Sequence, residues 1–168
     1  VNALVGRGPL CPVGVDVTSS VAVSVTQDDA LDSDLVAELF TAIRLLSGYP
    51  IPEHLPEIRV VSPAEIQRML CKGDCGIKAF YLPGQGIYLS DAIGSLDDAF
   101  GRSVLLHELV HHVQHVTGRF DIIADACDRW FSKEREAYQV QNAYLQREGD
   151  RRRFALDSLP HMCGDRDP

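Results

Sequence analysis

Residues 105–113 read Leu105-Leu106-His107-Glu108-Leu109-Val110-His111-His112-Val113, the most strongly patterned stretch of the chain. Leucine and valine recur there at the spacing of a helix that is buried in a hydrophobic core. Polar groups in so apolar a helix need a buried partner or a functional role. His107 and His111 are four residues apart, which places them one above the other on one helix face. The stretch therefore predicts a core helix that presents two imidazoles side by side.

The flanking sequence sets the limits of this helix and predicts a second helix after it. Ser95-Leu96-Asp97-Asp98 has the pattern of a capping box and Gly118 is a typical stop, so we expect a helix from Ser95 to Thr117. A further helix is expected over residues 130–148, where Gly149 ends it. This second helix carries the next glutamates of the chain.

The rest of the chain alternates short apolar runs with turn signals. A capping box at Ser62-Pro63-Ala64-Glu65 predicts a helix over residues 63–70, and a helical repeat of leucines predicts another over 31–47. An alternating run predicts a strand over residues 15–25, and short apolar runs predict strands over 58–61, 79–82 and 86–90. Helices mixed with short, largely hairpin-joined strands indicate an α+β fold.

The strand expected over residues 86–90 comes shortly before the helix that carries the histidines. It is either an ordinary core strand or a sheet edge at which an extended peptide could pair as an added strand. The sequence leaves these two alternatives open.

The composition of the chain argues against several classes of protein. The 168 residues are 45% hydrophobic and carry 24 acidic against 16 basic side chains, a formal net charge of -8. The acidic balance argues against general binding to nucleic acids and against docking on anionic membranes. No apolar run reaches the ~18–20 residues that span a bilayer. We therefore expect one domain over residues 1–168 that neither binds nucleic acid nor inserts into a membrane; its oligomeric state does not follow from composition.

Five cysteines are present, and they do not form the paired C-x-x-C motifs of a thiolate metal site. Cys71 and Cys75 flank a tight segment that suits a small disulfide loop, and Cys127 could pair with Cys163 to hold the C-terminal tail. Cys11 is then left over. Paired cysteines point to an oxidising compartment, so we expect a secreted or periplasmic protein.

The spacing of His107 and His111 fits a shared metal ion, because two imidazoles four residues apart on a helix can direct their nitrogens at one zinc. Glu108 is too short and too offset to join them as a ligand. Its carboxylate can instead remove a proton from a water in the same site. The motif therefore predicts a hydrolytic metal site with Zn²⁺ as cofactor. The alternative is a histidine pair with a purely structural role.

Zinc needs a third protein ligand if one position is to stay open for water. A third histidine six residues after His111 is excluded, because Thr117 stands there. The remaining candidates follow the histidine helix: Asp121, Asp125, Glu134 and Glu136. We favour Glu136, because the small Ala137 beside it lets the second helix approach closely, whereas Glu134 fits a solvated, charged face.

The pattern His107-Glu108-x-x-His111 with a downstream Glu136-Ala137 resembles the gluzincin clan of zinc metallopeptidases, which share a thermolysin-like arrangement. The wider pattern is L-L-H-E-L-V-H-H-x-Q, then a cysteine, then E-R-E-A-Y-x-x-Q, and it resembles small bacterial proteins of unassigned activity with a minimal metallopeptidase core. The resemblance covers residues 78–148. It implies a minimal zincin-like core, in which a short mixed or antiparallel sheet packs on the histidine helix. Residues 1–77 are then an N-terminal support region of unknown role, and residues 149–168 a C-terminal tail.

Carried over residue by residue, the resemblance implies that His107, His111 and Glu136 bind Zn²⁺ and that Glu108 is the general base. The implied activity is that of a zinc metallopeptidase, a hydrolase that cleaves amide bonds in a peptide or protein substrate. One position departs from the clan: Val140 stands where thermolysin-like enzymes carry an aspartate that orients a histidine. The contacts behind the ligands must therefore differ.

Further residues near the motif are candidates for supporting roles. Tyr138 could donate a hydrogen bond to the oxyanion, and His115 shares the face of the ligand histidines. Gln114 could hydrogen-bond a ligand or support the second helix. The competing hypothesis is a non-catalytic zinc-containing module, binding or inhibitory, on a metallopeptidase-like fold. The intact Glu108 counts against this alternative.

Overall fold

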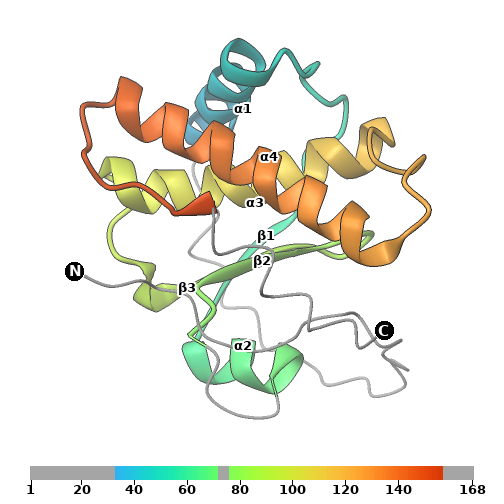
Figure 1. Ribbon diagram of the computed structural model, residues 1–168. Helices are drawn as coiled ribbons and strands as arrows, with labels where there is room; N and C mark the ends of the chain where they lie inside the picture. Colours follow the sequence, from blue (N-terminus) through green and yellow to red (C-terminus); the bar gives the residue numbers. More distant parts are fainter. Residues whose placement is uncertain (1–32, 72–75, 157–168) are drawn as a thin grey trace.

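The computed structural model describes residues 33–71 and 76–156, and within these ranges the chain forms four α-helices and a three-stranded sheet (Figure 1). The α+β class is therefore confirmed. The strand expected over residues 15–25 lies outside the described residues. In chain order the elements are α1 (Ser33–Ser47), β1 (Ile58–Val61), α2 (Pro63–Leu70), β2 (Ala79–Leu82), β3 (Gly86–Ser90), a 3₁₀ turn (Asp91–Ile93), α3 (Ala99–Thr117) and α4 (Ala126–Arg147).

The sheet is mixed, with the strand order β1-β3-β2. β1 pairs with β3 in parallel, and β2 pairs with β3 as the antiparallel hairpin expected from the sequence. β3 is buried along its whole length. It is therefore the central strand, so of the two alternatives for residues 86–90 the sheet edge is wrong. The edges of the described sheet belong to β1 and β2.

Different helices cover the two faces of this sheet (Figure 1). Side chains alternate across β3, so Ile87 joins the main core with α1, α3 and α4, whereas Tyr88 packs with Ile66 of α2 on the opposite face. α3 lies between the sheet and the other two helices of the main core. The apolar side chains within residues 105–113 of this helix are fully buried, as the sequence predicts: Leu105, Leu106, Leu109, Val110 and Val113.

α3 begins at Ala99, later than the start expected at Ser95. Asp98 is the N-cap, and its Oδ1 accepts a 2.6 Å hydrogen bond from the N–H of Gly101. Ser95 instead accepts a 3.0 Å hydrogen bond from the N–H of Asp97 in the preceding turn. A Cβ on Gly101 would collide with the Ser95 carbonyl oxygen, so the glycine allows this turn to pack closely against the helix.

α4 begins at Ala126, and the expected start near residue 130 was therefore too late. Asp125 caps this helix by accepting a 2.8 Å hydrogen bond from the N–H of Asp128. The additional turn places Glu134 well inside the helix. The buried side of α4 consists of Ala137, Val140, Gln141, Tyr144 and Leu145.

Each of the two predicted disulfides includes a cysteine that lies outside the described ranges. Cys11, Cys75 and Cys163 lie outside them, so the Cys71–Cys75 and Cys127–Cys163 disulfides stay predictions, together with the extracytoplasmic location that rests on them. None of the helices in the described part of the chain has the length and apolar character needed to cross a bilayer.

Candidate metal centre

Three side chains converge between α3 and α4: His107 and His111 from α3, and Glu134 from α4. The two histidine Nε2 atoms lie 3.1 Å apart. Glu134 places Oε2 3.3 Å from Nε2 of His107 and Oε1 3.2 Å from Nε2 of His111. All three side chains are largely buried, with 8%, 14% and 18% of their surface exposed. Within the described ranges they form the one group of three or more side chains positioned to share a metal ion.

The spacing of these atoms fits a tetrahedral ion. Zinc bonds of about 2.0–2.1 Å to nitrogen and oxygen give a tetrahedron with edges of about 3.3 Å. The two nitrogens are 3.1 Å apart, and the two oxygens of the Glu134 carboxylate lie 3.3 Å from one nitrogen and 3.2 Å from the other, which are distances close to these edges. Two imidazoles and one carboxylate are also a donor set that leaves the fourth position of zinc for water. The residues therefore fit Zn²⁺ by both spacing and chemistry.

Glu136, which the sequence favoured as the third ligand, lies elsewhere. Its Oε2 accepts hydrogen bonds from the Tyr49 hydroxyl at 2.6 Å and from Nε2 of Gln114 at 3.0 Å. Its Oε1 forms an ion pair of 3.1 Å with Arg119. The third candidate ligand is therefore corrected to Glu134, an alternative that the sequence left open.

The rotation of α4 about its own axis explains why Glu134, and not Glu136, faces the histidines. Successive helical residues turn by about 100°, so Glu134 and Glu136 point in directions about 200° apart. Glu134 shares a stripe with Ala137 and Gln141, at spacings of three and seven residues, and both of these side chains are buried. The small Ala137 that suggested a close helix approach thus belongs to the stripe of Glu134. This spacing is visible in the sequence and could have identified the ligand.

The two aspartates that follow α3 take other roles. Asp125 caps α4, and Asp121 is exposed and lies against Gly118 at the end of α3. Neither belongs to the group formed by His107, His111 and Glu134.

His107 is held at its second nitrogen and at its ring face. Nδ1 lies 3.1 Å from Oε1 of Gln141, and the ring centroid lies 4.3 Å from that of Tyr138. With Glu134 as the ligand, Tyr138 rather than Val140 takes the place four residues later, where the clan that the sequence resembles carries an aspartate. Sequence reasoning missed Gln141, although its place on the stripe of Glu134 was a signal.

His111 has a matching contact. Its Nδ1 lies 2.9 Å from Oε1 of Gln114, which is fully buried. Nε2 of Gln114 donates to the Lys133 carbonyl oxygen at 3.0 Å as well as to Glu136. Gln114 thus contacts a candidate ligand and also supports the second helix, the two roles that the sequence suggested for it.

Glu108 is buried beside the cluster, and its carboxylate accepts a hydrogen bond from the backbone of Tyr81 in β2. Burial raises the pKa of Glu108 above the ordinary carboxyl value, although positive charge on His107 and His111 acts in the opposite direction. A carboxylate with a raised pKa is better suited to accept and return a proton near neutral pH.

The charges of the three convergent side chains depend on one another. Burial opposes the ionisation of Glu134, but His111 and His107 outweigh it and hold the pKa of Glu134 well below its ordinary range. Burial likewise disfavours charge on His111, yet the neighbouring Glu134 carboxylate raises the pKa of His111 to about 9. Without a metal ion, the site thus pairs an ionised Glu134 with a protonated His111 at neutral pH.

The other two histidines of α3 contact different partners. Nε2 of His112 donates to the His54 carbonyl oxygen at 3.0 Å, and its Nδ1 lies 3.4 Å from the Tyr81 hydroxyl. His115 is exposed, and its ring lies 6.1 Å from that of Tyr81. Each step of four residues turns about 40° beyond a full turn, so His115 is rotated about 80° from His107. The structure therefore brings His115 to Tyr81 rather than to the cluster.

The fold and this cluster define an α+β protein with a candidate three-ligand metal centre. A family model described as Domain of unknown function (DUF6647) matches residues 28–163, and the chain belongs to this family. The matched range includes both histidines and Glu134. No curated protein and no solved structure matches the chain.

Proposed function

We propose that this protein is a zinc-dependent hydrolase, specifically a metallopeptidase that cleaves amide bonds. The observation that carries the proposal is the convergence of His107, His111 and Glu134 at tetrahedral spacing, with Glu108 buried beside them. The resemblance of the sequence to gluzincins supports the same chemistry, with Glu134 in place of Glu136. A zinc ion held there would act as a Lewis acid and lower the pKa of a water toward ~7.

Glu108 is the general base of the proposed reaction. Its carboxylate takes a proton from the attacking water and delivers it to the leaving amine nitrogen. Tyr138 is the proposed hydrogen-bond donor to the oxyanion. Burial and the negative charges of Glu134 and Glu108 raise the pKa of the Tyr138 hydroxyl, so this group keeps its proton at neutral pH.

The outer edge of β2 is the proposed docking site for the substrate backbone. The N–H of Ser90 donates to the Lys78 carbonyl oxygen at 2.8 Å, so these two residues form a hydrogen-bonded pair of the β2–β3 ladder. Such pairs alternate along the strands, so Ala79 and Tyr81 direct their N–H and C=O groups away from β3. No strand in the described part of the chain pairs with that edge. The outward N–H of Tyr81 already donates to Glu108, so a peptide added there would lie next to Glu108 and pair with the remaining groups of this edge, those of Ala79 and the Tyr81 carbonyl.

The test compares the zinc-loaded protein with its Glu108→Gln variant on a broad peptide library, with cleavage detected by mass spectrometry. The variant should keep zinc, measured by elemental analysis, because Glu108 is not among the convergent ligands. Its cleavage rate should fall by about 10²–10⁴-fold, the usual contribution of a general base. Glu148→Gln is the matched control, because Glu148 is exposed at the end of α4.

The outcomes separate the proposal from its alternatives. A wild-type protein that binds zinc but cleaves no peptide would favour the non-catalytic zinc-containing module. A protein that binds no zinc after purification without chelator would leave His107 and His111 a purely structural role.

A further inference from the structure

The two candidate ligand histidines have the same kind of partner at the nitrogen that faces away from the cluster. Nδ1 of His107 lies 3.1 Å from Oε1 of Gln141, and Nδ1 of His111 lies 2.9 Å from Oε1 of Gln114. Both glutamines are buried, with exposed fractions of 2% and 0%. A glutamine amide can either donate or accept, so the contacts behind each amide decide which nitrogen of the histidine carries a proton.

The direction of the contact at His111 is set by two acceptors. Nε2 of Gln114 lies 3.0 Å from the Lys133 carbonyl oxygen and 3.0 Å from Oε2 of Glu136. A carbonyl oxygen can only accept, so the NH₂ end of the amide must face it. Oε1 of Gln114 therefore faces His111, and Nδ1 of His111 must donate. Glu136 is itself held by the Tyr49 hydroxyl and by Arg119.

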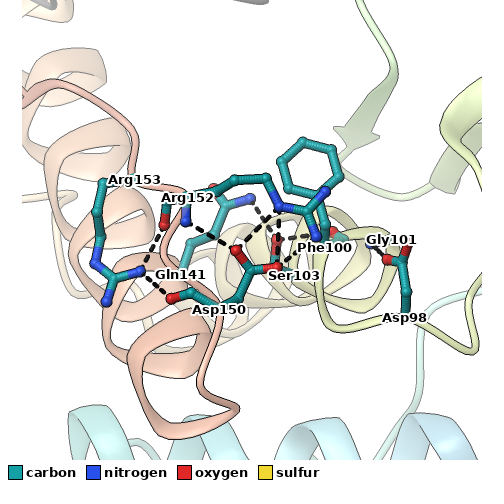
Figure 2. Close-up of polar contacts among 8 residues, drawn as sticks. All are labelled: Asp98, Phe100, Gly101, Ser103, Gln141, Asp150, Arg152 and Arg153. Carbon is teal, nitrogen blue, oxygen red and sulfur yellow. Dashed lines mark hydrogen bonds and ion pairs between the residues drawn. The ribbon is translucent and has the colours of Figure 1, made fainter. Parts of the chain in front are cut away.

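The direction of the contact at His107 is set by a longer chain of bonds, part of which Figure 2 shows. The Ser103 hydroxyl donates to the Phe100 carbonyl oxygen at 2.8 Å, so its oxygen is left to accept. Nε2 of Gln141 donates to that oxygen at 3.1 Å. Oε1 of Gln141 is then turned to His107, whose Nδ1 must donate. Both chains of bonds thus end on backbone carbonyls, which cannot reverse them.

We infer that Gln114 and Gln141 are positioning residues that hold a proton on Nδ1 of both histidines and aim both Nε2 lone pairs at one ion. Metal-binding histidines usually donate this proton to a carboxylate, a backbone carbonyl or water. Here two neutral amides accept this proton. The two imidazole rings are therefore oriented without placing a further negative charge beside the ion. The inference rests on the proposed metal site for its consequence, although the position of the two protons is a property of the chain itself.

Nuclear magnetic resonance of the ¹⁵N-labelled protein tests this arrangement directly. Long-range ¹H–¹⁵N correlations assign each ring nitrogen, and both histidines should show an exchange-protected Nδ1–H with and without added Zn²⁺. In the zinc-loaded protein neither Nε2 should carry a proton. Gln114→Met and Gln141→Met remove the amides at similar side-chain volume. Each should lose the protected signal of its own histidine and weaken zinc binding by about 10–100-fold.

Two further variants distinguish positioning from packing. Gln141→Glu keeps an acceptor at the same place, so it should retain the protected Nδ1–H of His107. Gln139→Met is the matched control, because Gln139 is exposed on the same helix, and it should change neither the signal nor the zinc affinity.

A proton on Nε2 of either histidine in the zinc-loaded wild-type protein would overturn the inference. Protected signals that survive unchanged in both methionine variants would overturn it as well. If the wild-type protein binds no zinc but the signals still depend on Gln114 and Gln141, the positioning role stands and the proposed hydrolase fails. If a methionine variant does not fold, the wild-type spectrum decides whether the inference holds, because it shows which nitrogen of each histidine carries the proton.

Discussion

The Tyr49 hydroxyl donates a hydrogen bond of 2.6 Å to Oε2 of Glu136, although 87 residues separate the two in sequence. Tyr49 follows α1 and is buried, with 4% of its surface exposed. Its ring also lies 5.1 Å below the guanidinium of Arg119, which pairs with the other carboxylate oxygen. Glu136 is therefore the point at which the end of α1, the turn after α3 and α4 are joined.

This arrangement predicts that the same substitution at two nearby positions of α4 affects different properties, stability at Glu136 and zinc affinity at Glu134. Glu136→Gln should lower the free energy of unfolding by about 1.5–3 kcal/mol, because it weakens hydrogen bonds to a charged group. Its zinc affinity should fall by no more than about tenfold, because the residue acts through Gln114. Glu134→Gln should lower zinc affinity by more than about 100-fold, because it replaces a ligand. Urea unfolding and zinc titration of both variants measure these differences.

Each variant is the control for the other, because the same substitution is made two residues apart on one helix. Zinc binding that is lost in Glu136→Gln and kept in Glu134→Gln would restore Glu136 as the third ligand.

Much of the fold follows from signals that lie within a few residues of one another. The helix of residues 63–70 begins at the capping box of Ser62 and Glu65, in which the Glu65 N–H donates to the Ser62 hydroxyl and Oε2 of Glu65 accepts from the Ser62 N–H. The hairpin of β2 and β3 follows from two apolar runs with a Pro-Gly turn between them. The central place of β3 and its parallel pairing with β1 depend instead on contacts across about 30 residues, which no local pattern specifies.

The same distinction between local patterns and contacts distant in sequence applies to the candidate metal site. The spacing of His107 and His111 is a property of a single helix, so the sequence alone predicts that they face one ion. The choice between Glu134 and Glu136 depends on how α4 is rotated against α3, and on that point the apolar stripe was a better guide than the neighbouring Ala137. The contact of Gln141 with His107 requires both helices in place, and sequence reasoning did not find it.

Zinc binding should release a proton near neutral pH. The pKa of His111 is raised to about 9 despite its burial, because of the Glu134 carboxylate, so the imidazole is protonated at pH 7 without metal. Coordination needs its lone pair, so the proton must leave. Apparent zinc affinity should therefore rise about tenfold per pH unit from pH 7 to pH 9 and level off above it. Calorimetry at pH 7 in buffers of different ionisation enthalpy measures the released proton.

The low pKa of Glu134 adds no second proton to this balance, because the carboxylate is already ionised at pH 7. In Glu134→Gln the cause of the raised His111 pKa is removed, so proton release at pH 7 should be smaller. Equal proton release in the wild-type protein and in this variant would mean that another group titrates on binding.

The proposed docking edge of β2 predicts a substitution that affects substrate binding without affecting the sheet. Ala79 is the first residue of β2, and its N–H points away from β3. Ala79→Pro should therefore keep the β2–β3 ladder but remove one hydrogen bond to a bound peptide. KM should rise by about 2- to 12-fold with kcat nearly unchanged, since one such bond contributes about 0.5–1.5 kcal/mol.

Thermal unfolding of Ala79→Pro is the control, and its midpoint should match that of the wild-type protein. An unchanged KM at an unchanged midpoint would place the substrate backbone elsewhere.

Asn142 of α4 holds the segment that follows this helix. Its Nδ2 donates to the Phe154 carbonyl oxygen at 3.0 Å, and its Oδ1 accepts from the Phe154 N–H at 2.8 Å. The Phe154 ring lies 5.3 Å from Tyr138, which packs on His107.

Figure 2 shows a neighbouring part of the same segment, in which Arg152 pairs with Asp150. The Arg152 guanidinium lies 4.3 Å from the ring centre of Phe100. The segment thus lies against residues that surround a candidate ligand.

Asn142→Ala should loosen this segment more than it destabilises the rest of the protein. Loss of both hydrogen bonds costs about 1–3 kcal/mol locally, which makes the open state about 5- to 150-fold more populated. The exposed run Arg151-Arg152-Arg153 then becomes a faster target for trypsin under native conditions. Mass spectrometry measures the cleavage rate, with Gln146→Ala as control because Gln146 is exposed on the same helix. Equal rates in the wild-type protein and Asn142→Ala would mean that the aromatic contacts of Phe154, rather than Asn142, hold the segment in place.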